Sequence, residues 1–109
     1  MEVKEFVELM FKRMEDKLND IKNKNMSKVE DPQKLEEAIN KAIEVVREYK
    51  ERCMQAQSIE EAKACVEEAR DAAKQYLGRD MTGLKTAKAT FSRCVNMYMK
   101  KLLSQAVTA

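Results

Sequence analysis

Seven apolar positions in the middle of the chain recur at alternating steps of four and three residues. They are Leu35, Ile39, Ala42, Val46, Tyr49, Cys53 and Ala56. Because an α-helix repeats every 3.6 residues, this spacing keeps the seven side chains on one side of a helix. Such a helix gains most of its stability by packing that side against other helices. The register therefore predicts amphipathic helices that pack lengthwise.

Three other segments show the same periodicity, and the four predicted helices span residues 2–24, 32–56, 59–77 and 83–106. The sequence holds only two Gly and one Pro, too few for the turns of an all-β fold. Short loops make consecutive helices antiparallel. We expect one all-α domain over residues 1–109, a four-helix up-down-up-down antiparallel bundle. The alternative is a three-helix core with the first helix loosely docked or exchanged within a homodimer.

Local signals mark where the predicted helices begin and end. Asp31 is an N-cap before Pro32, which fits the first helical position because its missing N–H is not needed there. Ser58 and Glu61 form a capping box, in which the Glu61 side chain reaches back to the N–H of the cap residue. Gly78 is expected to end the third helix in a left-handed conformation.

The composition argues against most enzyme mechanisms. The chain contains no histidine, which removes the commonest general acid or base near neutral pH and a common metal ligand. The two glycines stand singly at predicted helix ends, so no glycine-rich phosphate loop is present. Adjacent glutamates such as Glu36 and Glu37 point about 100° apart on a helix and do not share a proton easily. We expect a non-enzymatic protein without a cofactor or metal.

Positive charge is concentrated at the C-terminal end of the chain. Residues 79–109 carry six Lys or Arg and one acidic residue, a net charge of 6 − 1 = +5, although the whole chain carries only +2. A basic amphipathic helix of this kind binds an acidic protein, a nucleic acid or an anionic surface. The nucleic-acid alternative would use Lys85, Lys88, Arg93 and Lys100. A third interpretation is pairing with the acidic helix before it.

The favoured function is protein–protein interaction through the last helix, including self-association as a homodimer. Met97 and Met99 fall outside the best apolar stripe of that helix, and methionine suits adaptable binding surfaces. The end of the helix is expected to overhang its shorter neighbour and to expose apolar side chains there. The predicted partner-binding residues are Arg93, Met97, Met99, Lys100, Lys101, Leu102, Leu103 and Val107.

Cysteines at positions 53, 65 and 94 lack the close pairs of structural zinc sites. An antiparallel bundle brings all three near one level, with Cys65 opposite Cys94. This geometry predicts a Cys65–Cys94 disulfide or, as a further alternative, a thiol-based redox or three-thiolate metal site. The simplest interpretation is three small buried residues.

No apolar run reaches the length of a transmembrane helix, and residues 1–25 do not resemble a signal peptide. The default expectation is a cytoplasmic protein. A secreted protein that had lost its signal peptide would give the same pattern.

Overall fold

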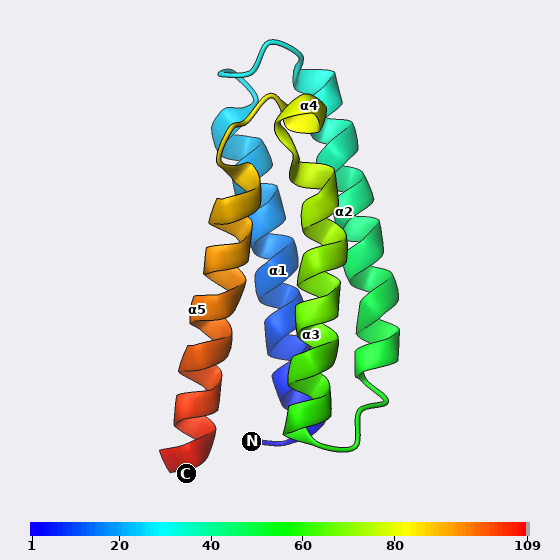
Figure 1. Cartoon of the computed structure of the whole chain (residues 1–109), viewed down its shortest axis with the longest axis vertical. Helices are drawn as coiled ribbons and strands as arrows, with labels where there is room; N and C mark the ends of the chain where they lie inside the picture. Colours follow the sequence, from blue (N-terminus) through cyan, green and yellow to red (C-terminus); the bar gives the residue numbers. More distant parts are fainter. Residues whose placement is uncertain (109) are drawn as a thin grey trace.

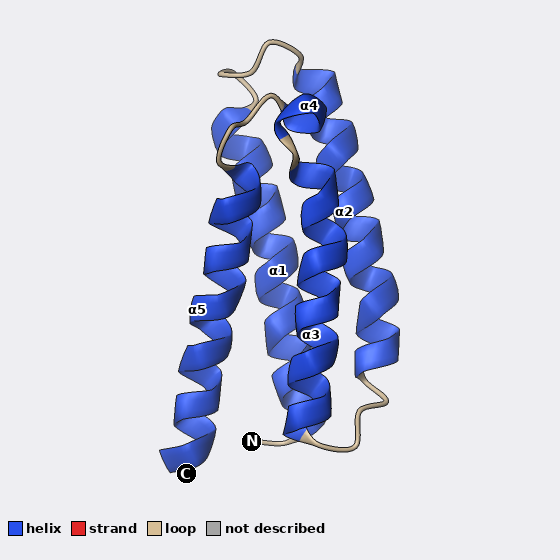
Figure 2. Cartoon of the chain, viewed as in Figure 1, coloured by secondary structure: helices blue, strands red, loops and turns tan. Residues whose placement is uncertain are grey.

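A computed structural model of the chain describes residues 1–108, and the side chains of residues 1–105. Four long helices make up most of the structure: α1 (Val3–Asn25), α2 (Pro32–Cys53), α3 (Ile59–Lys74) and α5 (Ala87–Thr108). A 3₁₀ turn, η1 (Gln75–Leu77), and a short helix, α4 (Arg79–Thr82), lie between α3 and α5. The described residues contain no strand (Figure 2). The predicted all-α class is confirmed.

The four long helices lie side by side, and each runs opposite to the one before it (Figure 1). Helices α1 and α3 contact each other and also both α2 and α5. Helices α2 and α5 therefore lie on opposite sides of the central α1–α3 pair. Helix α5 covers one edge of the molecule, and one of its sides remains open to solvent.

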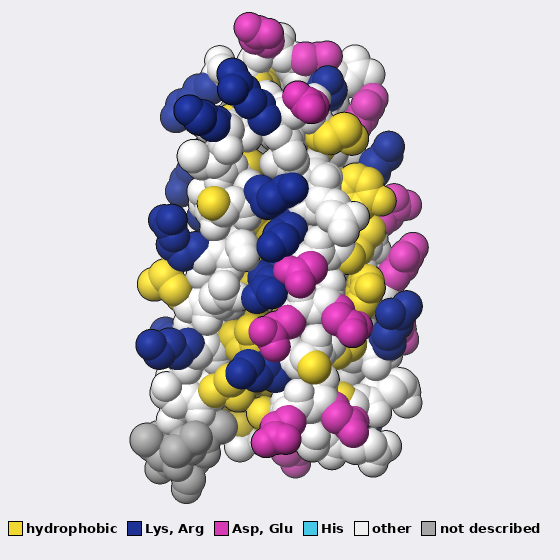
Figure 3. All heavy atoms as spheres, in the orientation of Figure 1, with side chains coloured by type: hydrophobic (Ala, Val, Ile, Leu, Met, Phe, Trp, Pro, Cys, Tyr) yellow, Lys and Arg dark blue, Asp and Glu magenta, His cyan; other side chains and the backbone are white. Residues whose placement is uncertain are grey.

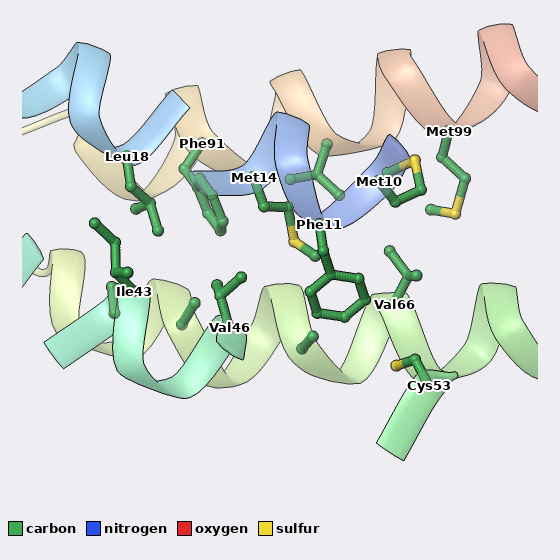
Figure 4. Packing of buried hydrophobic residues seen from close by; sticks show 14 of the residues in the cluster. Met10, Phe11, Met14, Leu18, Ile43, Val46, Cys53, Val66, Phe91 and Met99 are labelled. Atoms are coloured by element: carbon green, nitrogen blue, oxygen red, sulfur yellow. The ribbon is translucent and has the colours of Figure 1, made fainter. Parts of the chain in front are cut away.

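Helix α1 supplies a large part of the core. Its buried residues are Phe6, Val7, Met10, Phe11, Met14, Leu18 and Ile21, and they follow the predicted helical spacing. Phe11 and Met14 point into the space between the helices, toward side chains from the facing elements (Figure 4). The first helix is thus packed within the single chain, unlike the loosely docked helix of the alternative prediction.

The predicted start signals of α2 and α3 are present as hydrogen bonds. The Asp31 side chain accepts from the backbone N–H of Lys34 at 3.2 Å, and Pro32 occupies the first turn. The Ser58 hydroxyl accepts from the N–H of Glu61 at 3.2 Å. The Glu61 carboxylate accepts from the N–H of Gln57, one residue before the cap position expected for a capping box.

The buried face of α3 consists mainly of small residues. Ala62, Ala69 and Ala73 are all fully buried, together with Val66. Side chains of this size let neighbouring backbones come close, so α3 can contact all three other long helices.

The connection from α3 to α5 differs from the prediction. Gly78 is extended, with φ −66° and ψ 155°, so the expected left-handed stop at this residue is wrong. The left-handed residue is Gly83, with φ 75°, which ends α4. Thr82 is buried, and its hydroxyl donates to the Gly78 carbonyl and accepts from the N–H of Leu84. Because these residues form a separate turn, α5 begins at Ala87, four residues later than predicted.

Candidate functional site

The exposed side of α5 carries half of the predicted partner-binding residues. Arg93, Met97, Lys100 and Lys101 are all exposed. Met97 has an exposed fraction of 66%, the highest among the large hydrophobic side chains that the structure describes. A flexible apolar side chain thus stands in water among three cations.

Two of the predicted anchor residues belong to the core instead. Met99 and Leu102 are each only 4% exposed, and Met99 points into the bundle (Figure 4). The expectation that they are available to a partner is wrong. Because α5 packs against both α1 and α3, a larger part of its circumference is buried than the predicted apolar stripe covers. Leu103 is half-buried. The side chain of Val107 lies outside the described residues.

A shallow groove of about 500 Å³ lies between α1 and α5, and we call it the α1–α5 groove. It is lined by Arg13, Lys17, Thr90, Arg93, Cys94, Met97, Tyr98 and Lys101. Four of these eight residues are cationic and none is acidic. Its apolar lining residues are Cys94, Met97 and Tyr98. This groove combines exposed apolar atoms with a charge of one sign.

A second groove, the α3–α5 groove, lies on the other side of α5 and measures about 610 Å³. It is lined by Lys63, Glu67, Asn96, Met99, Lys100, Leu103 and Ser104. Glu67 partly balances the two lysines, so this groove does not present charge of a single sign. At its edge, the Arg70 guanidinium donates to the side-chain oxygen of Asn96 and ties α3 to α5.

The charge pattern of the surface follows the helices. Figure 3 shows Lys and Arg side chains along the left edge, over α5, with no Asp or Glu among them. Acidic side chains gather over α3 and toward the right edge in the same view. Of the six basic residues expected in segment 79–109, four lie on α5, whereas Arg79 lies on α4 and Lys85 precedes α5.

The residues of the nucleic-acid alternative are exposed but do not form one continuous site. Lys85, Lys88, Arg93 and Lys100 all reach solvent. Arg93 lines the α1–α5 groove, whereas Lys100 lines the α3–α5 groove. The aromatic side chains that the structure describes are all buried or half-buried. These residues consequently lack an aromatic platform on which bases would stack.

The cysteine pairing is not the predicted one. Cys53 and Cys65 form a disulfide, and Cys94 is a free, half-buried thiol. The expected Cys65–Cys94 bond is wrong, because α2 ends at Cys53 and the non-helical residues 54–58 bring its last turn beside the second turn of α3. With two sulfurs bonded to each other, the three-thiolate metal site is also wrong. Within the described residues no cluster of three or more Cys, Asp or Glu is placed to hold a metal ion.

Two carboxylates are stabilised by neighbouring cations. Lys24, followed by Lys17, lowers the pKa of Asp20 on α1. On α3, Arg70 and then Lys74 lower the pKa of Asp71. In both cases the ion pair and hydrogen bond favour the charged carboxylate and outweigh the opposing effect of desolvation. Lys17 therefore lines the α1–α5 groove as a cation already paired with Asp20.

The chain matches no family model, no curated protein and no solved structure. Among the helices of the described residues, none is both long enough and apolar enough to cross a membrane.

Two residues of the α1–α5 groove are absent from the sequence-based site. Arg13 and Lys17 lie on α1, whose charges balance when counted over the whole segment. Their separation by four residues places them on one side of that helix, next to the predicted apolar stripe. A charge count does not single them out, because Asp20 lies on the same side of the helix and pairs with Lys17.

Proposed function

We propose that this chain is a non-enzymatic protein-interaction module that binds an acidic protein through the exposed side of α5. The observation that carries the proposal is Met97, which is 66% exposed between Arg93 and Lys101 with no acidic residue lining its groove. Exposed apolar atoms gain free energy when a partner covers them, and surrounding charge selects that partner. Met97 would supply affinity, and the cations would supply specificity.

An acidic foreign partner fits this surface better than a second copy of the chain. In a two-fold homodimer the same patch meets itself, so the cations of α5 would face the cations of another α5. The apolar residues that favoured self-association included Leu102, which is 4% exposed in the single chain. Sedimentation at increasing concentration tests this point. A monomer is expected, and a dimer abolished by Met97→Glu would favour self-association.

Nucleic-acid binding is supported less well than protein binding. Of its four candidate cations, Arg93 and Lys100 line different grooves and Lys85 and Lys88 line neither groove. The described aromatic side chains are half-buried or buried. Binding would therefore rest on phosphate contacts alone, which weaken steeply with salt.

Affinity capture from the native host tests the proposed function. Three forms of the full chain serve as bait: wild type, Met97→Glu and Met81→Glu. Met81 is a matched control because it is also an exposed methionine, at 36%, but lies on α4. The expected result is an acidic protein that wild type and Met81→Glu retain and Met97→Glu loses. Equal retention by all three baits would contradict binding through α5.

A further inference from the structure

The α1–α5 groove has cations on both of its walls. Arg13 and Lys17 come from α1, and Arg93 and Lys101 come from α5. Lys17 is paired with Asp20 at 3.3 Å. Arg13, Arg93 and Lys101 make no ion pair with any side chain that the structure describes. Each wall thus offers at least one cation that is free to pair with a partner.

Three apolar residues line the groove together with these cations. Cys94 and Tyr98 are half-buried, and Met97 stands above them in solvent. The groove is open to solvent, whereas sites for small molecules enclose most of their ligand. Its α5 wall runs from Thr90 to Lys101, about three helical turns, so an elongated partner fits along it.

The partner has to be recognised through side chains. The described residues include no strand edge that could pair with an extended peptide. Tyr98 is the single aromatic residue of the groove, and proline-rich peptides need an aromatic-lined surface. Arg93 and Lys101 are eight residues apart, which is about 12 Å along a helix, or rather more than two turns. A helix laid into the groove would meet both cations.

We infer that the α1–α5 groove, and not the α3–α5 groove, receives an amphipathic partner helix with acidic residues on both sides of a narrow apolar stripe. The apolar stripe covers Met97 and Tyr98, one acidic row faces Arg13, and the other faces Arg93 and Lys101. This inference rests on the proposed function and adds α1 to the binding surface. It also predicts that the bound helix covers Cys94.

Two adjacent lysines give a matched pair of variants for the test. Lys100 and Lys101 are both exposed, but Lys100 lines the α3–α5 groove and Lys101 the α1–α5 groove. The probe is a fluorescent synthetic helical peptide of about 18 residues with a Leu/Ala stripe flanked on both sides by Glu. A second peptide carries Gln in place of every Glu. Binding is measured by anisotropy to the full chain, with circular dichroism confirming unchanged helicity of each variant.

The acidic peptide is expected to bind the wild-type chain, and the Gln peptide more weakly. Lys101→Glu should weaken binding of the acidic peptide about tenfold, because it replaces attraction by repulsion, while Lys100→Glu should change it by less than about threefold. Bound peptide should also slow alkylation of Cys94 by iodoacetamide, and Cys94 is the only free thiol in the chain.

Equal losses in Lys100→Glu and Lys101→Glu would overturn the assignment to the α1–α5 groove while leaving α5 as the binding helix. Failure of the acidic peptide to bind, or tighter binding of single-stranded DNA at 150 mM salt, would overturn the acidic-helix partner. The proposed function is judged separately, by the Met97→Glu bait and the native partner. A failed peptide with a successful capture therefore rejects this inference alone.

Discussion

Cys53, the last residue of α2, is joined by a disulfide to Cys65 in the second turn of α3, with their Cα atoms 5.5 Å apart. The bond closes a loop across a sequence separation of 12 residues and holds α2 against α3. Cys53 is fully buried and Cys65 is half-buried, so the bond also belongs to the packed interior.

Removal of this disulfide should destabilise the fold. The double variant Cys53→Ala/Cys65→Ala should lose about 3 kcal/mol in the free energy of unfolding, because the open loop has more conformational entropy when unfolded. Urea denaturation without reductant measures the loss, with Cys94→Ala as control. Thiol titration of unfolded, unreduced protein should find one reactive thiol per chain. Three reactive thiols would contradict the pairing.

The small residues of α3 should tolerate no added volume. Ala69→Leu inserts a large side chain where the residue is fully buried and should cost about 1–3 kcal/mol of stability. Ala64→Leu makes the same change on the exposed side of the same helix and should alter stability by less than about 0.5 kcal/mol. Thermal unfolding of both variants compares them directly. Similar melting temperatures would show that α3 is not closely packed at Ala69.

The two glycines should respond in opposite directions. Gly83 has φ 75°, so Gly83→Ala should lose about 1 kcal/mol to left-handed strain. Gly78 has φ −66° and an added Cβ would meet no atom within 4 Å. Gly78→Ala should therefore gain about 0.4–1 kcal/mol by restricting the unfolded chain. Chemical denaturation of each variant provides the comparison, and a loss at Gly78 as large as that at Gly83 would refute the assigned conformations.

Acid should weaken the pairing of Asp71 with Arg70 and Lys74. The pKa of Asp71 is lower in the folded chain than its usual value, so its contribution to stability is complete above about pH 4 and is lost as pH falls through the folded pKa. Asp71→Asn should therefore lose less stability than wild type between pH 6 and pH 2.5. Asp16→Asn, which removes an exposed aspartate, is the control. Urea denaturation at several pH values measures the difference, and identical curves for wild type and Asp71→Asn would contradict this contribution.

The apolar spacing of the sequence was sufficient to predict the long helices and most of their buried residues. Periodicity reports burial directly, because a residue such as Phe6 or Ile39 is placed by its own helix. Start signals such as Asp31 and Ser58 are equally local. The all-α class follows from such local information.

Features that depend on two or more helices were predicted less well. The disulfide depends on where α2 ends. Helix α2 ends at Cys53, three residues before the predicted end, and Cys65 pairs with Cys53 and not with Cys94. The burial of Met99 depends on the rotation of α5 about its own axis relative to α3. The apolar stripe of one helix does not determine this rotation. One wall of the α1–α5 groove is formed by the side of α1 that carries Arg13. The sequence of the last helix alone does not indicate that α1 contributes this wall.

The central claim is that a partner covers the exposed side of α5, and oxidation footprinting of methionines tests it most directly. In the isolated chain Met97 should be oxidised readily, whereas Met99, which is 4% exposed, should react slowly. In the complex captured from the native host, Met97 should become protected while Met81 on α4 keeps its reactivity as an internal reference. Equal oxidation of Met97 in the free and bound chain would contradict the account.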